Sequence, residues 1–191
     1  MELRVIEAEK FTSNKDGGYG DYFVLDDNTG VKVQRLASGE YSFSDRNQFL
    51  SVEQAMKSEA LTAAKVEANA LYLAEPSGIV PKCYGLVLVK RGQFYSVGIM
   101  MEHLGNQRLT DLMPYRYDLT IEAQREREIK IQDIKRPLFE KLQACGIKHE
   151  DLHNSNVMVK DGKYYAIDFS PALFGWCEIA PNIKPQQVEA A

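Results

Sequence analysis

Cysteine, net basic charge and long apolar runs are all scarce in this chain, and each shortage excludes a class of protein. The only three cysteines, Cys83, Cys145 and Cys177, lie far apart and form no Cys-x-x-Cys pair, which argues against a metal knuckle or a redox pair. The formal net charge is −4, so no overall basic field attracts nucleic acid or anionic lipid. No apolar run approaches the roughly 18 residues that span a bilayer. We therefore expect buried, reduced thiols, a cytoplasmic location, and neither nucleic acid nor membrane as a partner.

What the chain does contain is typical of a globular protein. Of its 191 residues 45% are hydrophobic and 26% are charged, which is enough apolar material for a sizeable core in one domain or two small lobes. The first residues, MELRVIEAEKF, are charged from the second position onward. They carry no signal for secretion by the general pathway, although a composition-coded signal for a specialised export system would not be visible in them.

Turn residues and apolar alternation predict strands in the first part of the chain. Residues 1–37 contain short β-like runs, and Asp26–Gly30 is rich in residues that favour a hairpin. Residues 38–50 lack a clean period and predict a loop. A helix is expected from Ser51, which forms a capping box with Gln54, to the stop signal at residues 75–78. Residues 79–105 then contain three apolar segments, which predict three antiparallel strands.

The second part of the chain has a helical pattern. Residues 114–145 are heavily charged, with alternating signs that are typical of a solvated helical face. Pro137 lacks a backbone N–H, so we expect a kink there, or two helices that meet near Arg136. Gly146 stands where a C-terminal cap belongs. With the strand-rich first half, this predicts a mixed α+β fold.

Residues 149–153, HEDLH, fit two kinds of chemistry. In the first, His149 and His153 would hold zinc from one face of a helix, with Glu150 as a general base. That helix is disfavoured, because Gly146 ends the preceding helix and Asn154-Ser155-Asn156 prefers caps and turns. A third ligand is also lacking, since the only other histidine is His103, far upstream, and Glu178 lies in no recognisable helix.

The second chemistry is phosphate transfer, and it accounts for residues that the zinc reading ignores. Asn156 follows Asp151 by five positions, and Asp168 follows Asn156 by twelve. Asp161-Gly162 lies between Asn156 and Asp168 and is a strong hairpin signal, so the chain should return Asp168 to the same end as Asn156. An amide oxygen and a carboxylate that meet there suit Mg²⁺ bound to phosphate.

At these residues the sequence resembles the protein-kinase-like superfamily. HEDLHNSN matches the family's His-x-Asp-x-x-x-x-Asn, and IDFS stands in the place of Asp-Phe-Gly. The resemblance implies that Asp151 accepts or orients the proton of the nucleophile, that Asn156 and Asp168 hold the metal, and that His149 is structural. DLHNSN is most similar to the loop of aminoglycoside and choline kinases, so the loop alone does not specify a protein substrate.

The resemblance extends into the first half of the chain. GVKVQ is similar to the Val-Ala-x-Lys strand, which implies that Lys32 contacts the α- and β-phosphates while its flanking valines point into the core. The following helix should supply a carboxylate partner for Lys32, for which we expect Glu67, with Glu59 as the reserve and Glu53 as a further candidate.

Two further segments complete the nucleotide site that the resemblance implies. GIMMEHLG is similar to the strand that enters the hinge, with Met101 at the back of the adenine pocket and backbone groups of Glu102 and Leu104 offered to adenine. DGGYGDYFVL would be the loop over the phosphates, in which Gly18 and Gly20 allow close backbone approach. A simple turn at Gly17–Gly20 is the alternative.

The chain also departs from the family pattern. Glu150 stands where many protein kinases have arginine, so the usual switch by activation-loop phosphorylation is not expected. Ser170 replaces the glycine of Asp-Phe-Gly. After Ser170 only 21 residues remain, with no Ala-Pro-Glu-like sequence and no helices that would dock a peptide. The resemblance covers about residues 15–170. In its economy the chain is similar to short kinases of phages and injected bacterial effectors, for which the location would be the host cytoplasm.

Together these features predict a bilobal protein-kinase-like fold, with a strand-rich N-lobe at 1–101 and a truncated C-lobe at 102–191. The expected activity is a minimal ATP- and Mg²⁺-dependent Ser/Thr protein kinase, able to phosphorylate itself, with an unknown protein substrate or activating partner. A kinase-shaped module that binds ATP or a partner without transfer is the first alternative. A small-molecule kinase is the second.

Overall fold

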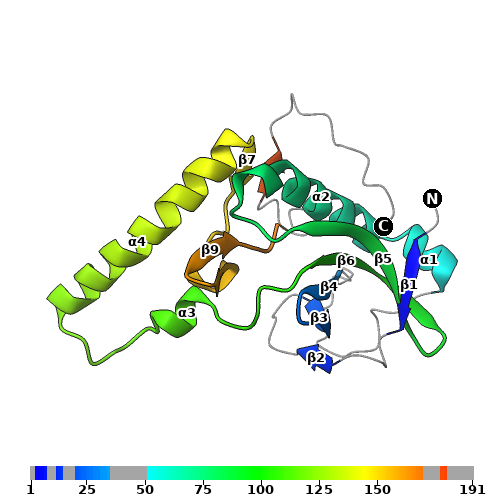
Figure 1. Ribbon diagram of the computed structural model, residues 1–191, viewed down its shortest axis with the longest axis horizontal. Coiled ribbons are helices and arrows are strands. Elements are labelled where there is room, and N and C mark those ends of the chain that lie inside the picture. The colour runs from blue at the N-terminus through cyan, green and yellow to red at the C-terminus, as the bar shows by residue number, and fades with distance from the viewer. Residues whose placement is uncertain (1–2, 8–11, 15–19, 35–50, 170–176, 180–191) are drawn as a thin grey trace.

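The computed structural model describes residues 3–7, 12–14, 20–34, 51–169 and 177–179, which form a mixed α+β fold (Figure 1). A curled six-stranded sheet and its helices make up the first half, and a long helix with two small two-stranded sheets makes up the second. The elements are β1 (Arg4–Glu7), β2 (Thr12–Asn14), β3 (Gly20–Asp26), β4 (Thr29–Gln34), α1 (Val52–Met56), α2 (Glu59–Ala74), η2 (Glu75–Ser77), β5 (Cys83–Arg91), β6 (Phe94–Glu102), α3 (Leu109–Leu112), α4 (Ile121–Ala144), β7 (Ile147–His149), η3 (Asn154–Asn156), β8 (Val157–Lys160), β9 (Lys163–Ala166) and β10 (Cys177–Ile179).

The large sheet has the strand order β1-β5-β6-β4-β3-β2. All neighbours are antiparallel except β1 and β5, which run parallel. The hairpin expected at Asp26–Gly30 is confirmed, because β3 and β4 pair up to Asp26 and Thr29, and the Asn28 N–H donates to Asp26 Oδ1 at 2.8 Å. This places β4 in the interior of the sheet, between β3 and β6.

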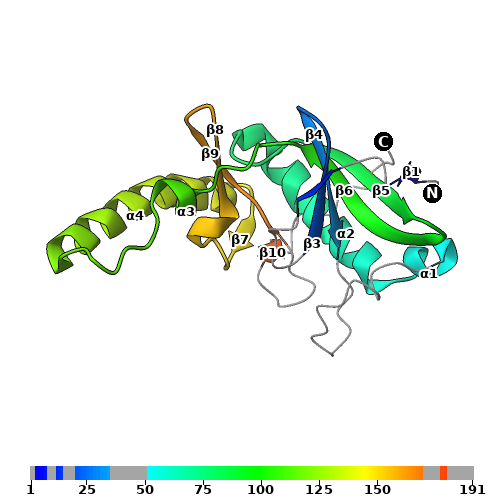
Figure 2. The same cartoon turned by 90° about the horizontal axis from the view of Figure 1, so that it is seen from below.

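The two faces of β4 have different surroundings. Val31 and Val33 are fully buried in a cluster that also contains Phe23, Val87 and Met100. Lys32 lies between them and points to the opposite face, where α2 packs against β4, β5 and β6 (Figure 2). The alternation expected around Lys32 is therefore confirmed, and it follows from the two-residue period of a strand.

The helix expected from Ser51 starts as predicted but does not continue as one helix. The Ser51–Gln54 capping box is present and begins α1. A second helix, α2, begins after Ser58, whose hydroxyl accepts the Leu61 N–H and donates to the Ala55 carbonyl. Serine competes in this way for backbone groups and favours caps over helix interiors. The stop at residues 75–78 is confirmed, since η2 ends at Gly78 with φ of +68°.

The prediction of three strands in residues 79–105 was wrong, because two form. IVPKCYG and LVLVK were expected as separate strands, but Cys83–Arg91 is one strand, β5. Its register against β6 shifts between Cys83 and Gly85, and Gly85 has φ of +112°. The glycine therefore makes a bulge within the strand, which the left-handed region open to glycine allows.

The helix expected at residues 114–145 begins later and is not interrupted. It is α4, which starts after the N-cap Thr120 and continues through Pro137 to Ala144. Of the two alternatives expected at Pro137, two separate helices that meet near Arg136 do not form. Ile131, Leu138 and Leu142 are buried on both sides of the proline, and this packing holds the helix together despite the missing backbone N–H. Gly146 follows with φ of +77°, as expected for a C-terminal cap.

The two halves share one hydrophobic core, which includes Leu71 of α2, Ile99 of β6, Leu142 of α4 and Phe169. A backbone hydrogen bond also joins them, since the Ala166 N–H donates to the Ile79 carbonyl at 2.8 Å. In the described parts of the chain, no helix is both long and apolar enough to cross a membrane.

Candidate functional site

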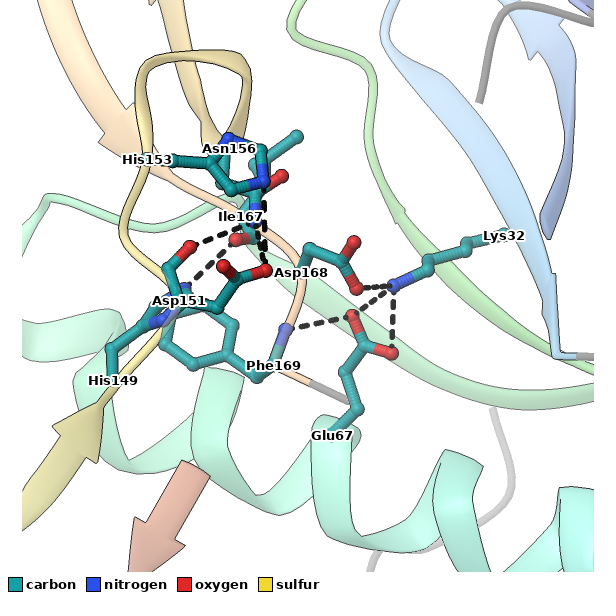
Figure 3. A network of polar contacts seen from close by, with 9 residues as sticks. All are labelled: Lys32, Glu67, His149, Asp151, His153, Asn156, Ile167, Asp168 and Phe169. Atoms are coloured by element: carbon teal, nitrogen blue, oxygen red, sulfur yellow. Dashed lines mark hydrogen bonds and ion pairs between the residues drawn. The ribbon is translucent and has the colours of Figure 1, made fainter. Parts of the chain in front are cut away.

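Three charged side chains from distant parts of the chain meet at the junction of the two halves (Figure 3). Lys32 Nζ lies 2.7 Å from Glu67 Oε1, 2.9 Å from Glu67 Oε2 and 2.7 Å from Asp168 Oδ1. The lysine comes from β4, the glutamate from α2, and the aspartate from the segment after β9. The pairing of Lys32 with Glu67 is the one that the sequence predicted, whereas the direct contact with Asp168 was not anticipated.

Burial and charge both act on this cluster. The Glu67 side chain is only 1% exposed, Lys32 is 16% exposed and Asp168 is 21% exposed. Burial alone would lower the pKa of Lys32, but the Glu67 and Asp168 carboxylates outweigh it and raise that pKa above its ordinary value. The lysine is therefore held as a cation. Glu67 Oε1 also accepts the Phe169 N–H at 3.3 Å, which ties the Asp168 segment to α2.

The other glutamates considered as partners of Lys32 lie elsewhere. Glu53 is exposed and forms an ion pair with Lys57 at 2.6 Å. Glu59 is the first residue of α2 and is also exposed. Glu67 lies on the face of α2 that packs against the sheet, between the buried residues Ala64 and Ala68.

The hairpin predicted around Asp161-Gly162 is confirmed and brings Asn156 next to Asp168. Asp161 and Gly162 have φ of +51° and +73°, as in a type I′ turn, and β8 pairs with β9 on either side. The Ile167 N–H donates to the Asn156 carbonyl at 3.0 Å. Asp168 itself has φ of +69°, an uncommon conformation for a residue other than glycine, and one that is found at active sites where the surrounding structure enforces it.

Asp151 is held by the residues that follow it. Asn156 Nδ2 donates to the Asp151 carbonyl at 2.9 Å and to Asp151 Oδ2 at 3.2 Å. His153 Nε2 lies 3.5 Å from the same Oδ2, and His153 Nδ1 accepts the Ser155 N–H at 3.2 Å. Asn156 Nδ2 and His153 Nε2 contact the same oxygen of the Asp151 carboxylate, so the orientation of that carboxylate relative to Asn156 is fixed.

His149 has the structural position that was expected of it. It lies on β7, 2% exposed, with Nε2 3.0 Å from the Ile167 carbonyl and its ring 4.8 Å from the Phe169 ring. Burial lowers the pKa of His149, although the hydrogen bond to Ile167 and nearby carboxylates oppose this. A neutral imidazole can donate its Nε2–H to the Ile167 carbonyl, while the buried Nδ1 has no hydrogen-bond partner among the described residues. His149 thereby supports the backbone immediately before Asp168.

The zinc arrangement is excluded by the positions of the two histidines. His149 lies on a strand, and His153 is the N-cap of η3, so no continuous helix presents both. Among the described residues, no group of three or more His, Cys, Asp or Glu side chains converges on a metal position. Glu178, the remaining candidate ligand, lies on β10, where its backbone pairs with Lys148.

A cavity of about 580 Å³ opens beside the charged cluster. It is lined from the first half by residues of β3, β4, α2 and β6, and from the second half by residues of α3, η3, β8 and the segment after β9. Of the residues predicted for the site, those that line the cavity are Lys32, Glu67, Met101, Glu102, Leu104, Asn156 and Asp168. Asp151 does not line it, but its partners Asn156 and His153 do.

Two residues of this region, Tyr22 and Lys160, were missed by the sequence analysis. Tyr22 lines the cavity and contacts His103. Lys160 Nζ donates to Glu102 Oε1 at 2.8 Å and to the His103 carbonyl at 3.0 Å, so β8 is tied to the end of β6. The sequence contained a signal for Tyr22 alone: the hairpin predicted at Asp26–Gly30 places Tyr22 opposite Lys32 on the neighbouring strand.

The remaining predictions fall at the limits of the described residues. Gly18 lies outside them, and so does Ser170. Gly20 is the first residue of β3 and pairs with Gln34. The loop expected at residues 38–50 also lies outside the described part of the chain.

The donor set at the cluster suits a hard divalent cation bound together with phosphate. Asp168 offers a carboxylate, and Asn156, which uses Nδ2 to hold Asp151, retains an amide oxygen as a possible ligand. Oxygen ligands of this kind, completed by phosphate oxygens and water, are what Mg²⁺ prefers. Lys32 adds a fixed positive charge, and a cavity of this volume accommodates a small organic ligand.

Neither a protein-family model nor a curated protein matches the chain.

Proposed function

We propose that this protein is a Mg²⁺-dependent phosphotransferase that moves the γ-phosphate of ATP to a hydroxyl group, in a bilobal protein-kinase-like fold with a reduced second lobe. The observation that carries the proposal is the contact of Lys32 with both Glu67 and Asp168 at 2.7 Å. A lysine on a strand, its glutamate partner on the adjacent helix, and the aspartate after the hairpin are the parts that kinases use together.

The proposed bilobal arrangement has its support in how the cavity is built. The sheet and α2 form one wall, and α3, η3 and β8 form the other. Residues 103–108 connect the two, and a bridge between Arg108 and Met158 fixes that connection to β8. A nucleotide in this cavity would contact both halves, as in kinases.

Each polar residue receives a role from its position. Lys32 would bind the α- and β-phosphates, with Glu67 keeping its side chain in place. Asn156 and Asp168 would hold Mg²⁺, which when bound neutralises charge on the phosphate oxygens. Asp151 would accept the proton of the attacking hydroxyl, with its carboxylate oriented by Asn156. Backbone groups of Glu102 and Leu104 would meet the adenine edge.

The proposed acceptor is a Ser or Thr hydroxyl of a protein, including this chain itself. A nucleotide-binding module without transfer is the second candidate. It is favoured by the position of Asp151, which does not line the cavity. The two candidates differ in whether bound ATP loses its γ-phosphate, and not in which residues bind it.

Labelled ATP separates the two candidates. The protein is incubated with γ-labelled ATP and Mg²⁺, alone and with general Ser/Thr acceptor proteins, and transferred label is measured. The variants are Lys32→Ala and, as a matched control, Lys57→Ala, which removes an exposed lysine outside the site. We expect transfer by the wild type and by Lys57→Ala, and none by Lys32→Ala. Equal transfer by Lys32→Ala would overturn the assigned roles, and tight ATP binding without transfer would favour the binding module.

A further inference from the structure

Tyr22 lies in the cavity next to the proposed phosphate site but has no part in the phosphate chemistry. It pairs with Lys32 in the register of β3 and β4, and paired residues of an antiparallel sheet project from the same face. Both side chains line the cavity. An aromatic ring therefore lies on the same sheet face as the lysine, one strand away from it.

The ring is held in one position by residues of two other segments. A Cβ built on Gly30 would lie 2.0 Å from Tyr22 Oη and 2.3 Å from Cζ, so the phenol end of the ring fills the space of a side chain at position 30. Tyr22 Oη lies 3.2 Å from His103 Nδ1, and the two rings stack with centroids 5.8 Å apart. His103 is in turn anchored by its N–H, which donates to the Asn28 carbonyl at 2.8 Å.

Apolar and adaptable side chains also line the cavity, beside charged ones such as Glu102. Met158 of β8 and Ile167 line the cavity from the second half, and Met101 and Leu71 line it from the first. Methionine is unbranched and fills irregular spaces. The cavity thus combines a fixed aromatic ring, soft apolar walls and, at the charged cluster, a place for phosphates.

In the connection after β6, few backbone N–H groups are free to donate a hydrogen bond to the edge of a nucleotide base. The Glu102 N–H donates to the Lys82 carbonyl, and the His103 N–H donates to Asn28. Among the described residues of this connection that line the cavity, this leaves Leu104 and Gly105 as candidate backbone donors. One N–H can bond to a ring nitrogen of adenine or to the carbonyl oxygen of guanine, so it discriminates weakly between them.

We propose that Tyr22, held by Gly30 and His103, is a stacking platform for the nucleotide base, and that the site consequently accepts purine nucleoside triphosphates generally, GTP as well as ATP. This inference rests on the proposed function, because it assumes a nucleotide in the cavity. Stacking on an aromatic ring tolerates every base, since each base has a π-face. Lys32 and the metal site would supply the part of the affinity that the triphosphate carries.

Binding measurements by calorimetry on the full chain test this inference. The ligands are ATP, GTP and inorganic tripolyphosphate, each with Mg²⁺. The variants are Tyr22→Leu, which removes the ring but keeps apolar bulk, and Tyr22→Phe, which keeps the ring. Tyr84→Leu is the matched control, because Tyr84 packs on the opposite face of the same sheet.

We expect the wild type to bind ATP and GTP with affinities within roughly tenfold of each other, because stacking is tolerant of the base. Tyr22→Leu should weaken both by roughly 5- to 150-fold. Tripolyphosphate should bind equally to all forms, and Tyr22→Phe and Tyr84→Leu should retain wild-type affinity for ATP.

Two results would overturn the platform: unchanged ATP affinity in Tyr22→Leu, or an equal loss for tripolyphosphate, which would indicate a collapsed site. If the wild type binds ATP more than about a hundredfold more tightly than GTP, the claim that the site accepts both purines is wrong, since stacking alone does not produce such a preference. A different result would contradict the proposed function and not the platform. Nucleotide binding that depends on Tyr22, without any phosphate transfer, supports the platform and contradicts only the phosphotransferase.

Discussion

Lys32 Nζ contacts both carboxylate oxygens of Glu67, at 2.7 and 2.9 Å, across a separation of 35 positions in the chain. The contact joins the interior strand β4 to α2 and buries a glutamate to 1% exposure. A carboxylate at that depth is costly unless it is paired and hydrogen-bonded. The pair is therefore as much a feature of the fold as of the candidate site.

Removing the lysine should destabilise the protein more than neutralising the glutamate. Lys32→Met leaves the Glu67 carboxylate buried without its cation, and we expect a loss of about 3–5 kcal/mol of unfolding free energy. Glu67→Gln keeps the shape, retains an acceptor for the Phe169 N–H and leaves Lys32 in contact with Asp168. We expect it to cost roughly 1–2 kcal/mol, the typical cost of weakening a hydrogen bond to a charged group. Urea unfolding of both variants measures the difference.

The double variant completes this comparison. Because Lys32→Met with Glu67→Gln leaves no buried unpaired charge at this pair, its loss should be smaller than the sum of the two single losses. Additive losses would show that the pair is not coupled, contrary to the geometry.

Asp168→Asn should abolish the effect of Mg²⁺ on ATP binding while leaving the stability of the fold nearly unchanged. The amide keeps the size of the side chain and tolerates positive φ, and Lys32 retains Glu67, so we expect a change in stability of less than about 1 kcal/mol. In our proposal Asp168 holds Mg²⁺, so added Mg²⁺ should strengthen ATP binding by the wild type and not by this variant. ATP titrations with Mg²⁺ and with EDTA test this. A variant that keeps the full response to Mg²⁺ would show that the metal binds elsewhere.

His149 should make the fold sensitive to acid. Burial lowers the pKa of His149 in the folded protein, while the unfolded chain has the ordinary value of roughly 6.5. The unfolded state therefore binds more protons as pH falls through that value, and unfolding free energy decreases until pH drops below the folded pKa. His149→Gln can still donate to the Ile167 carbonyl but does not titrate.

The measurement is the unfolding free energy at about pH 8 and about pH 5, on either side of the ordinary histidine pKa. We expect a smaller difference between the two in His149→Gln than in the wild type. His153→Gln is the control, because the His153 side chain is 50% exposed and is not packed in the core. If His149→Gln leaves the acid sensitivity unchanged, His149 is not its source.

Pro137 lowers the stability of α4, which continues through it. Proline costs about 3 kcal/mol relative to alanine inside a helix, and up to about 1 kcal/mol of this is offset because proline restricts the unfolded chain. Pro137→Ala should therefore stabilise the protein by roughly 2 kcal/mol. Pro137 is exposed, so no packing is lost. Thermal unfolding checks this, and a lowered midpoint would mean that the proline has a packing role.

Local motifs were the most predictable part of this chain. The Ser51–Gln54 box, the turn at Asp161-Gly162 and the cap at Gly146 each depend on residues a few positions apart, whose chemistry is visible in the sequence. The predictions that failed each concerned a position at which the local sequence permits two different structures. Ser58 began a new helix within an alanine-rich stretch, Gly85 made a bulge where a strand end was expected, and α4 passed through Pro137 because buried leucines hold it.

Long-range contacts were predictable only where the family resemblance indicated them. The pairing of Lys32 with Glu67 was expected on that basis, and Glu67 is indeed the glutamate on the inner face of α2. The contacts of Tyr22 with His103 and of Lys160 with Glu102 span 81 and 58 positions and leave no local pattern. Such contacts follow from the packing of the two halves, which periodicity and turn chemistry do not specify.

The central claim is that Asp151 serves transfer and not binding, and the Asp151→Asn variant tests it most directly. The asparagine retains the size of the side chain and can still contact Asn156, so ATP should bind as tightly as in the wild type. Transfer of labelled γ-phosphate at saturating ATP and Mg²⁺ should fall by about 10²- to 10⁴-fold, the usual contribution of a general base. Transfer at the wild-type rate by Asp151→Asn would contradict the account.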